Sequence, residues 1–159
     1  MARESKGTAS RSPIHHEDVA ELLRSRGLRP TRARRQLLTY LASTDRHPSA
    51  EEITGELRAE GVEIGVATVY QNLSRLVDAG LALRLCGADG RARYDADTSA
   101  HDHAACDTCG RIIDLELDPG VRSALRRIPA ISNESGEWLV TRTSVELRGV
   151  CPECRSKSH

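Results

Sequence analysis

The stretch from residue 101 to residue 114, HDHAACDTCGRIID, carries two histidines, two cysteines in C-x-x-C spacing and an aspartate. A second C-x-x-C pair follows in GVCPEC. Two such pairs, separated by a segment long enough to fold back, are typical of a four-thiolate zinc site, because zinc has no ligand-field preference and binds thiolate sulfur readily. A lone redox dithiol or a disulfide framework of a small secreted chain fits this spacing less well. The sequence therefore predicts structural Zn2+ at Cys106, Cys109, Cys151 and Cys154.

The histidines of the same stretch offer a different ligand set. His101 and His103 are two residues apart, so on an extended strand both side chains point to one face. Imidazole nitrogen together with carboxylate oxygen is harder than thiolate and suits iron, manganese or zinc. A second metal site, with a different task from the first, is one interpretation. Solvated loop histidines are the alternative that spacing alone leaves open.

Length and composition restrict the class of protein. A chain of 159 residues suits one domain or two small ones, and 38% hydrophobic residues support a folded core. No stretch reaches the roughly 18 apolar residues of a membrane helix, and the N-terminus has no apolar signal core. We expect a cytoplasmic protein without membrane contact, whose cysteines bind metal rather than pair. Cys86, the unpaired fifth cysteine, is expected to be a small buried hydrophobe.

The net charge is zero, but its distribution is uneven. Six arginines and no acid lie between Arg24 and Arg35, whereas residues 87–159 carry ten basic and twelve acidic side chains. This arrangement fits a DNA-binding module joined to a regulatory one. A merely solvated charged face is the alternative.

Three helices are expected in the first third of the chain. Residues 1–15 are polar and expected to be disordered, with His15 and His16 solvated. The helical period begins at Glu17 and stops at Gly27. A second helix opens at Pro30 and Thr31, with apolar residues on one face. A third starts at a capping box and runs to about Ala59, the box being formed by Ser49 and Glu52.

The segment GVATVYQNLSRLVDAG, residues 65–80, predicts a fourth helix. Its apolar residues follow the helical period at Val66, Val69, Leu73, Leu76 and Val77. The opposite face is small and hydrogen-bonding, as a helix in a DNA major groove requires, and consists of Thr68, Tyr70, Gln71, Ser74 and Arg75. A helix that only packs on its own core would show the same period, so the pattern alone leaves that alternative open.

The elements that follow complete a two-part, α+β architecture. Residues 81–97 predict two strands around a turn at 88–90, so residues 16–95 are expected to form a winged helix-turn-helix. Residues 96–159 are expected to form a small α/β dimerisation module, clamped by zinc. We expect its strands at 112–117 and 137–147, and between them a helix at 119–128 with inward-facing Val121, Leu125 and Ile128. Such modules often dimerise through sheet edges.

With these residues in place, the chain from about Glu17 to Cys154 resembles the ferric uptake regulator (Fur) family of metal-dependent transcriptional regulators. The matching motifs stand in family order: LRSRGLRPTRARRQLL, HPSAEEI, VATVYQNLSRLVDAGL, RYD, HDHAACDTCGRIID and ELRGVCPEC. The resemblance implies a cytoplasmic homodimer that binds double-stranded operator DNA. It has an N-terminal winged helix and a C-terminal dimerisation domain, and metal bound at the hinge closes the dimer into its DNA-binding shape.

The resemblance also assigns residues. It places the structural Zn2+ on the four cysteines and the regulatory metal on His47, Asp95, His101, His103 and Asp114. Ligands from two domains can be satisfied together in only one relative orientation, so metal would stabilise that orientation by mass action. Arg29 matches a position that reaches the minor groove, and Tyr70 matches a base-contacting tyrosine. Gln71 stands where many iron sensors carry arginine.

Asp95 indicates the branch of the family. Peroxide-sensing members resemble this chain in having aspartate there and at the position of Asp114, and these hard ligands suit Fe2+ or Mn2+. By this resemblance, hydrogen peroxide would oxidise His47 or His101 when Fe2+ is bound, and the protein would release DNA. A second regulatory site of many iron and zinc sensors is not expected, because it needs histidines at Ala100 and near Thr143 and Ser144.

Three alternatives to a peroxide sensor remain. The first is a plain metal-uptake sensor of the same family for iron, manganese or zinc. The second is a metalloenzyme using the His/Asp site, but a catalytic metal keeps an open position beside a substrate pocket, and five ligands leave little room for it. The third is an interaction protein that does not bind DNA. We expect no enzyme, and no small-molecule ligand beyond metal ions and hydrogen peroxide.

Overall fold

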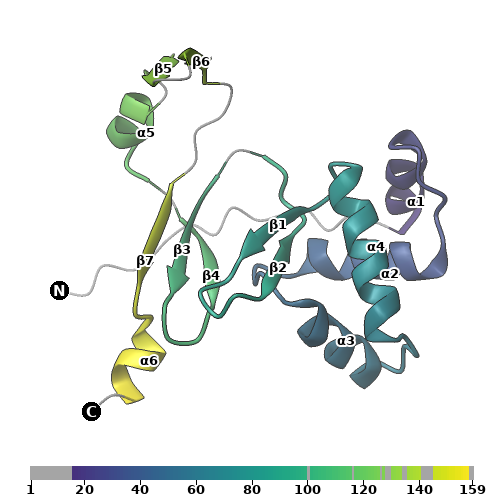
Figure 1. Cartoon of the computed structure of the whole chain (residues 1–159). Coiled ribbons are helices and arrows are strands. Elements are labelled where there is room, and N and C mark those ends of the chain that lie inside the picture. The colour runs from purple at the N-terminus through teal and green to yellow at the C-terminus, as the bar shows by residue number, and fades with distance from the viewer. Residues whose placement is uncertain are drawn as a thin grey trace.

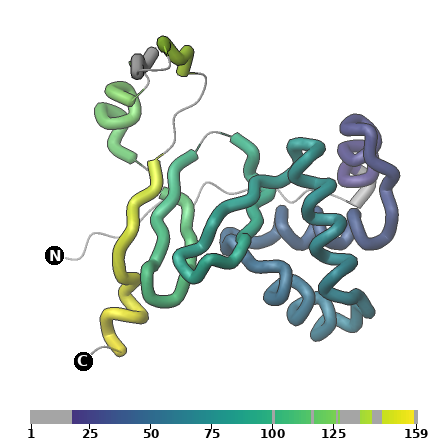
Figure 2. Tube along the Cα trace, viewed as in Figure 1, coloured from purple at the N-terminus to yellow at the C-terminus, as the bar shows by residue number. Residues whose placement is uncertain are grey.

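The computed structural model describes residues 16–99, 101–115, 117–125, 127, 130–133, 136–140 and 145–157. Four helices and a two-stranded wing form an N-terminal unit, and a three-stranded sheet with peripheral elements follows it (Figure 1). The chain passes from the helices through the wing into that sheet, so the wing lies between the two parts (Figure 2). The predicted disordered segment, residues 1–15, lies outside the described residues.

The helices of the N-terminal unit begin where the sequence supplies caps. The Thr31 side chain accepts a hydrogen bond from the backbone N–H of Arg34 and starts the second helix. Ser49 and Glu52 form the expected capping box at the start of the third. The helices are α1 (His16–Ser25), α2 (Arg32–Ser43), α3 (Ala50–Ala59) and α4 (Val66–Asp78).

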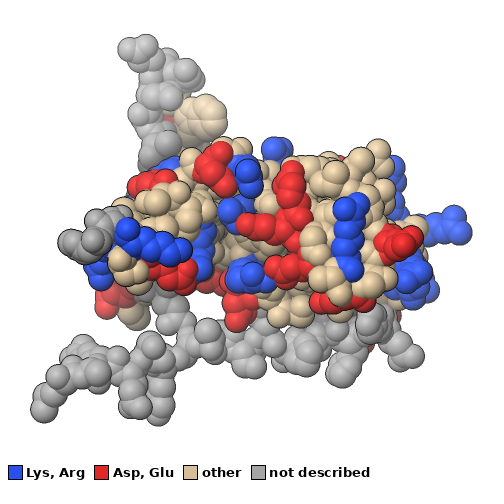
Figure 3. Space-filling model, turned by 90° about the horizontal axis from the view of Figure 1, so that it is seen from below, with Lys and Arg blue, Asp and Glu red and all other residues tan. Residues whose placement is uncertain are grey.

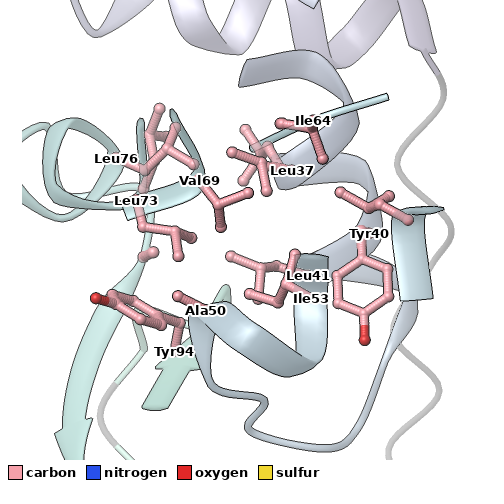
Figure 4. Close-up of a cluster of buried hydrophobic side chains, with 14 of the residues drawn as sticks. Leu37, Tyr40, Leu41, Ala50, Ile53, Ile64, Val69, Leu73, Leu76 and Tyr94 are labelled. Carbon is pink, nitrogen blue, oxygen red and sulfur yellow. The ribbon is translucent and has the colours of Figure 1, made fainter. Parts of the chain in front are cut away.

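A single apolar cluster joins the four helices to the wing. Leu37 and Leu41 of α2, Ile53 of α3 and Leu73 of α4 are almost completely buried (Figure 4). Tyr94, in the wing, packs against the same cluster. Burial of such aliphatic side chains is the main stabilising contribution, and it fixes α4 and the wing relative to each other.

The wing is the antiparallel pair β1 (Leu83–Cys86) and β2 (Ala92–Asp95), which confirms the expected hairpin. It is tied to the start of α3, because the N–H of Tyr94 donates to the carbonyl oxygen of Pro48 at 3.0 Å. Ser49 and Arg93 form an isolated antiparallel bridge beside this bond. The residues before α3 and the last strand of the wing are therefore one rigid piece.

The C-terminal sheet has the strand order β4-β3-β7. β3 (Asp102–Cys106) pairs antiparallel with β4 (Ile112–Leu115) and parallel with β7 (Glu146–Gly149). The register sets His103 opposite Asp114, which brings two of the predicted ligands together. The remaining elements are α5 (Pro119–Leu125), β5 (Ala130–Asn133), β6 (Gly136–Leu139) and α6 (Pro152–Lys157).

Several expectations for the C-terminal part were wrong. The helix after β4 ends at Leu125, and Val121, expected to face inward, is 49% exposed; Ile128 lies outside the described residues. An ion pair between Arg122 of this helix and the buried Asp102, at 2.8 Å, attaches it to β3. The strand expected at 137–147 is two strands in different sheets, with β6 pairing with β5 and β7 with β3.

Two smaller expectations also failed. Cys86 is exposed rather than buried, because it alternates with its wing neighbours toward solvent. Val66, the first residue of α4, is 40% exposed although Val69 in the same turn is fully buried. Ala100, Thr143 and Ser144 lie outside the described residues.

Acidic and basic side chains interleave on the face seen from below (Figure 3). Within the part of the chain that the structure describes, no helix is both long and apolar enough to cross a membrane.

Candidate metal centres and DNA-binding face

Five side chains from both parts of the molecule converge on one point. His47 comes from the connection before α3 and Asp95 from the end of β2, whereas the other three come from the C-terminal sheet and the residue that precedes it. One ligand atom from each residue lies within 4.8 Å of all the others, in the set His47, Asp95, His101, His103 and Asp114. The structure thus brings together all five residues predicted for the regulatory site.

The orientation of the rings fits a cation. The Nδ1 of His47 lies 3.1 Å from the carbonyl oxygen of Ile112, and the Nδ1 of His101 lies 3.0 Å from that of Ser99. A carbonyl only accepts, so each Nδ1 carries the proton and each Nε2 presents its lone pair in the neutral ring. This is the usual arrangement of histidines that bind metal.

The Nε2 atoms face carboxylate oxygens at short range. His47 Nε2 lies 3.0 Å from Asp114 Oδ1 and 3.5 Å from Asp95 Oδ2, and His101 Nε2 lies 3.0 Å from Asp95 Oδ2. Lone pairs facing carboxylate oxygens repel unless a proton or a metal cation lies between them. The donor set contains nitrogen and oxygen only, and such a set suits Fe2+ or Mn2+ better than a site that recruits thiolate.

Burial and charge move the histidine pKa values in opposite directions. Burial lowers the pKa of His47, but the hydrogen bond and negative charge of Asp95, with the charge of Asp114, outweigh burial and raise it. Burial and the neighbouring histidines lower the pKa of His103. The cluster therefore favours positive charge at His47 and disfavours it at His103.

The buried Arg93 binds the backbone of His47 and so supports this cluster. Arg93 is 7% exposed, and its Nη1 donates to the carbonyl oxygen of His47 and to Oε2 of Glu52, both at 3.1 Å. Its Nη2 lies 3.5 Å from Oδ2 of Asp89 in the wing turn. Arg93 and Asp95 lie on the same side of β2, so one strand carries both a predicted ligand and the group that holds the backbone of His47, another predicted ligand.

The four predicted zinc cysteines also converge. Their sulfur atoms lie within 4.8 Å of one another, and none of the chain's five cysteines, all of which are described, forms a disulfide. The backbone N–H of Cys151 donates to the sulfur of Cys106 at 3.3 Å, and hydrogen bonds of this kind lower the pKa of the Cys106 thiol to about 6. That thiol is an anion at neutral pH, the form that binds zinc.

Two ion pairs connect the segments that carry the two C-x-x-C pairs. Arg111 makes a bidentate contact with Glu153, with both N–O distances at 2.7 Å. Arg148 donates to Oδ1 of Asp107 at 2.9 Å. Each ion pair links the segment of the first C-x-x-C pair to that of the second, but all four side chains are exposed, so their contribution to stability is small.

The predicted DNA-facing residues of α4 share one exposed surface. The first turn of the helix has no acidic residue, so its N-terminus carries an uncompensated partial positive charge, which favours phosphate. Arg29 is also exposed, whereas Arg34 of the arginine cluster is buried and donates to the carbonyl oxygen of Arg29 at 2.8 Å. The exposed residues of the α4 face are Thr68, Tyr70, Gln71, Ser74 and Arg75.

Comparison with known proteins identifies the group to which this architecture belongs. Residues 25–133 match the model of the ferric uptake regulator family. The chain belongs to the ferric uptake regulator family. It is 35% identical over 146 residues to the peroxide-responsive repressor PerR of Staphylococcus aureus, a match that covers 91% of this chain and 95% of the relative.

Solved structures of other Fur proteins have the same fold. The ferric uptake regulator of Vibrio cholerae is 30% identical, with a TM-score of 0.68, over 83% of this chain and 98% of that one. The Pseudomonas aeruginosa regulator, solved with manganese, is 31% identical, with a TM-score of 0.68, over 84% of this chain and 98% of that one. This Fur-family protein is thus a metal-dependent DNA-binding regulator with a winged helix and a dimerisation domain. Family members are transcription regulators that bind operator DNA as dimers.

Some functional residues of this Fur protein were not found from the sequence. Arg93 was overlooked, although its position two residues before Asp95 on a strand placed it on the ligand's side. Glu51 was not singled out either, yet its carboxylate accepts a hydrogen bond from Tyr70 on the DNA-facing helix. The Arg111–Glu153 contact carries no local sequence signal, because the two residues lie forty-two positions apart.

Proposed function

We propose that this protein is a transcriptional repressor that senses hydrogen peroxide through bound Fe2+, with Mn2+ as a redox-inert corepressor. The metal is held by the hinge cluster, which consists of His47, Asp95, His101, His103 and Asp114. The observation that carries the proposal is a cluster of three imidazoles and two aspartates between the DNA-binding part and the C-terminal sheet, in which His47, Asp95 and His103 are buried and Asp114 is exposed. Bound Fe2+ supplies the reactivity toward peroxide. His47 and His101 are the proposed targets of oxidation, since each presents Nε2 to the metal position.

The cluster supports a switch because its ligands belong to two bodies. His47 and Asp95 move with the helices and wing, whereas His103 and Asp114 are paired within the C-terminal sheet. Occupied by a divalent cation, the five side chains hold one relative orientation of the two parts. Loss of one imidazole to oxidation would weaken that constraint and release DNA.

We assign the DNA contacts to the α4 face and to Arg29. The α4 residues are Thr68, Tyr70, Gln71, Ser74 and Arg75, and they are proposed to meet base edges and phosphates of the major groove. Arg29 is proposed to meet the minor groove. The functional unit is proposed to be a cytoplasmic homodimer, with apolar side chains exposed on the C-terminal part available for the interface.

The zinc and regulatory sites have separate tasks in this proposal. Zn2+ at Cys106, Cys109, Cys151 and Cys154 joins the two ends of the C-terminal module. This ion stays bound when the protein responds to its signal. Fe2+ or Mn2+ at the hinge cluster exchanges, because its ligands span two parts that can separate. A plain metal-uptake sensor is the second candidate, favoured by the likeness to Fur structures, one of which was solved with manganese.

The test uses a duplex selected by the Mn2+-loaded protein from a randomised library. Binding to this duplex is measured for the Fe2+ and Mn2+ forms before and after stoichiometric hydrogen peroxide, and oxygen addition is read by intact mass. We expect only the Fe2+ form to lose DNA and to gain oxygen on His47 or His101. Retained binding and unchanged mass in both forms would overturn peroxide sensing and leave the metal-uptake sensor.

A further inference from the structure

The DNA-facing helix presents a tyrosine whose hydroxyl is already engaged. The phenol of Tyr70, 41% exposed, donates to Oε1 of Glu51 at 2.8 Å. Glu51 lies in the first turn of α3 and is itself exposed, so the bond joins two helices at the surface and outside the apolar core. α3 and α4 lie side by side at this point (Figure 1).

The chemistry of the pair fixes the direction of the proton. An ionised carboxylate accepts only, so the phenolic hydrogen points at Glu51 and only lone pairs of the phenol oxygen remain for another partner. This bond lowers the pKa of Glu51 and raises that of Tyr70, so the carboxylate stays ionised and the phenol neutral at physiological pH. Together the two side chains present acceptors and no donor.

Base edges in the major groove differ in what they offer to such a pair. Adenine N6 and cytosine N4 donate, whereas guanine O6 and N7 and thymine O4 accept. We infer that Tyr70 and Glu51 form an acceptor-only reading pair, which selects an amine-bearing base and rejects guanine or thymine at the contacted position. The inference rests on the proposed DNA-binding role of α4 and assigns Glu51 as a specificity-determining residue.

The variants separate this selection from that of neighbouring groups. The amide of Gln71 can pair with adenine N6 and N7, so a preference that survives in Glu51→Ala and Tyr70→Phe belongs to Gln71. Glu52 caps α3 and binds Arg93, which directs its carboxylate away from α4. A carboxylate on a DNA-facing surface also repels phosphate. Glu51 therefore lowers the affinity for DNA of any sequence, but it adds discrimination between bases.

The experiment selects binding sites from a randomised duplex library with full-length, Mn2+-loaded, zinc-replete protein. Wild type is compared with Glu51→Ala, Glu51→Gln and Tyr70→Phe, and Glu21→Ala removes an exposed acid of α1 as the charge-matched control. Circular dichroism and zinc content check folding of each variant. Affinity for a random-sequence duplex across a salt series is measured alongside, because it reports phosphate contacts rather than base readout.

We expect the wild-type site to carry adenine or cytosine at one symmetry-related pair of positions, favoured by about fivefold or more over guanine and thymine. Glu51→Ala and Tyr70→Phe should lose that preference at the same positions, while Glu51→Ala binds random DNA no more weakly than wild type. Glu51→Gln should tolerate guanine or thymine there, because the amide adds a donor. Glu21→Ala should retain the wild-type site.

Three outcomes would count against the inference or against the function on which it rests. A wild-type site that Glu51→Ala and Glu51→Gln leave unchanged would overturn the inference and leave the DNA-binding function standing. A general loss of sequence preference at all positions in a folded Glu51→Ala would also overturn it, since the effect would then be structural. If wild type enriches no sequence, the proposed function falls, and the inference with it.

Discussion

The Nδ1 of His47 lies 3.1 Å from the carbonyl oxygen of Ile112, and the Nε2 of the same ring lies 3.0 Å from Oδ1 of Asp114. One imidazole from the DNA-binding part is therefore held on both nitrogens by β4 of the C-terminal sheet. Metal binding and the contact between the two parts share this side chain. Whatever changes one must change the other, because the two equilibria are linked.

Loss of His47 or Asp95, the hinge ligands of the N-terminal part, should uncouple DNA binding from metal binding. We expect His47→Ala and Asp95→Asn each to weaken Mn2+ binding by more than about 100-fold, the upper end of what even an outer-shell change costs. Calorimetric Mn2+ titration measures this, and Glu21→Ala serves as the control. Zinc content should stay unchanged, and an unaltered Mn2+ affinity would remove the residue from the site.

Removal of zinc should unfold the C-terminal module before the N-terminal one. Cys151→Ser or a strong chelator removes a ligand set that ties the start of α6 to the end of β3, and structural zinc supplies folding free energy directly. We expect a separate, lower-temperature transition in calorimetry and loss of Mn2+ binding. Arg111→Ala, by contrast, removes only an exposed ion pair and should have a small effect. A single transition unchanged by chelator would contradict the assignment.

Local signals explain which parts of the fold were predictable. Ser49 with Glu52, and Thr31, place caps that act within one turn of helix, so the helix starts follow from sequence. The C-terminal strands depend on partners far along the chain, and the segment 137–147 alternates like one strand although it serves two sheets. The zinc cysteines carry their own spacing signal. His47 has none by itself, and only its family motif placed it beside Asp114.

Arg93 should matter for both stability and metal binding, although it touches neither metal position. Arg93→Met removes the guanidinium N–H groups. The carboxylates of Glu52 and Asp89 and the carbonyl oxygen of His47 then lose the donors that Arg93 supplies. We expect a loss of about 2 kcal/mol in the free energy of unfolding, the usual value of hydrogen bonds to charged groups, because the carboxylates left behind are partly exposed. Urea unfolding and Mn2+ titration measure the two effects.

The conservative variant separates charge from geometry at this position. Arg93→Lys keeps the charge but cannot reach two groups at once in a planar fork, so it should restore only part of the stability. Full recovery of both stability and Mn2+ affinity by lysine would show that charge alone matters there.

Tyr40 and Glu56 should give the N-terminal part a pH-dependent contribution to stability. The buried Tyr40 hydroxyl donates to Oε2 of Glu56 at 2.7 Å, and Arg46 contacts both oxygens of the same carboxylate. The hydrogen bond from Tyr40, opposed by burial and aided by Arg46, lowers the pKa of Glu56 below its ordinary value of 4.5. Because the folded-state pKa is the lower one, this stabilisation is present above that value and is lost as pH falls through the folded-state pKa.

Tyr40→Phe tests this contribution while it preserves the ring that packs in the core. We expect the variant to lose about 1 kcal/mol of unfolding free energy at pH 7, the usual net value of one hydrogen bond. The difference from wild type should shrink as pH falls through the lowered pKa of Glu56, and denaturant unfolding from about pH 7 down to about pH 2 measures it. Zinc loss at low pH affects both proteins equally and cancels in the difference. A difference that is constant with pH would mean that the hydroxyl does not act through the ionised carboxylate of Glu56.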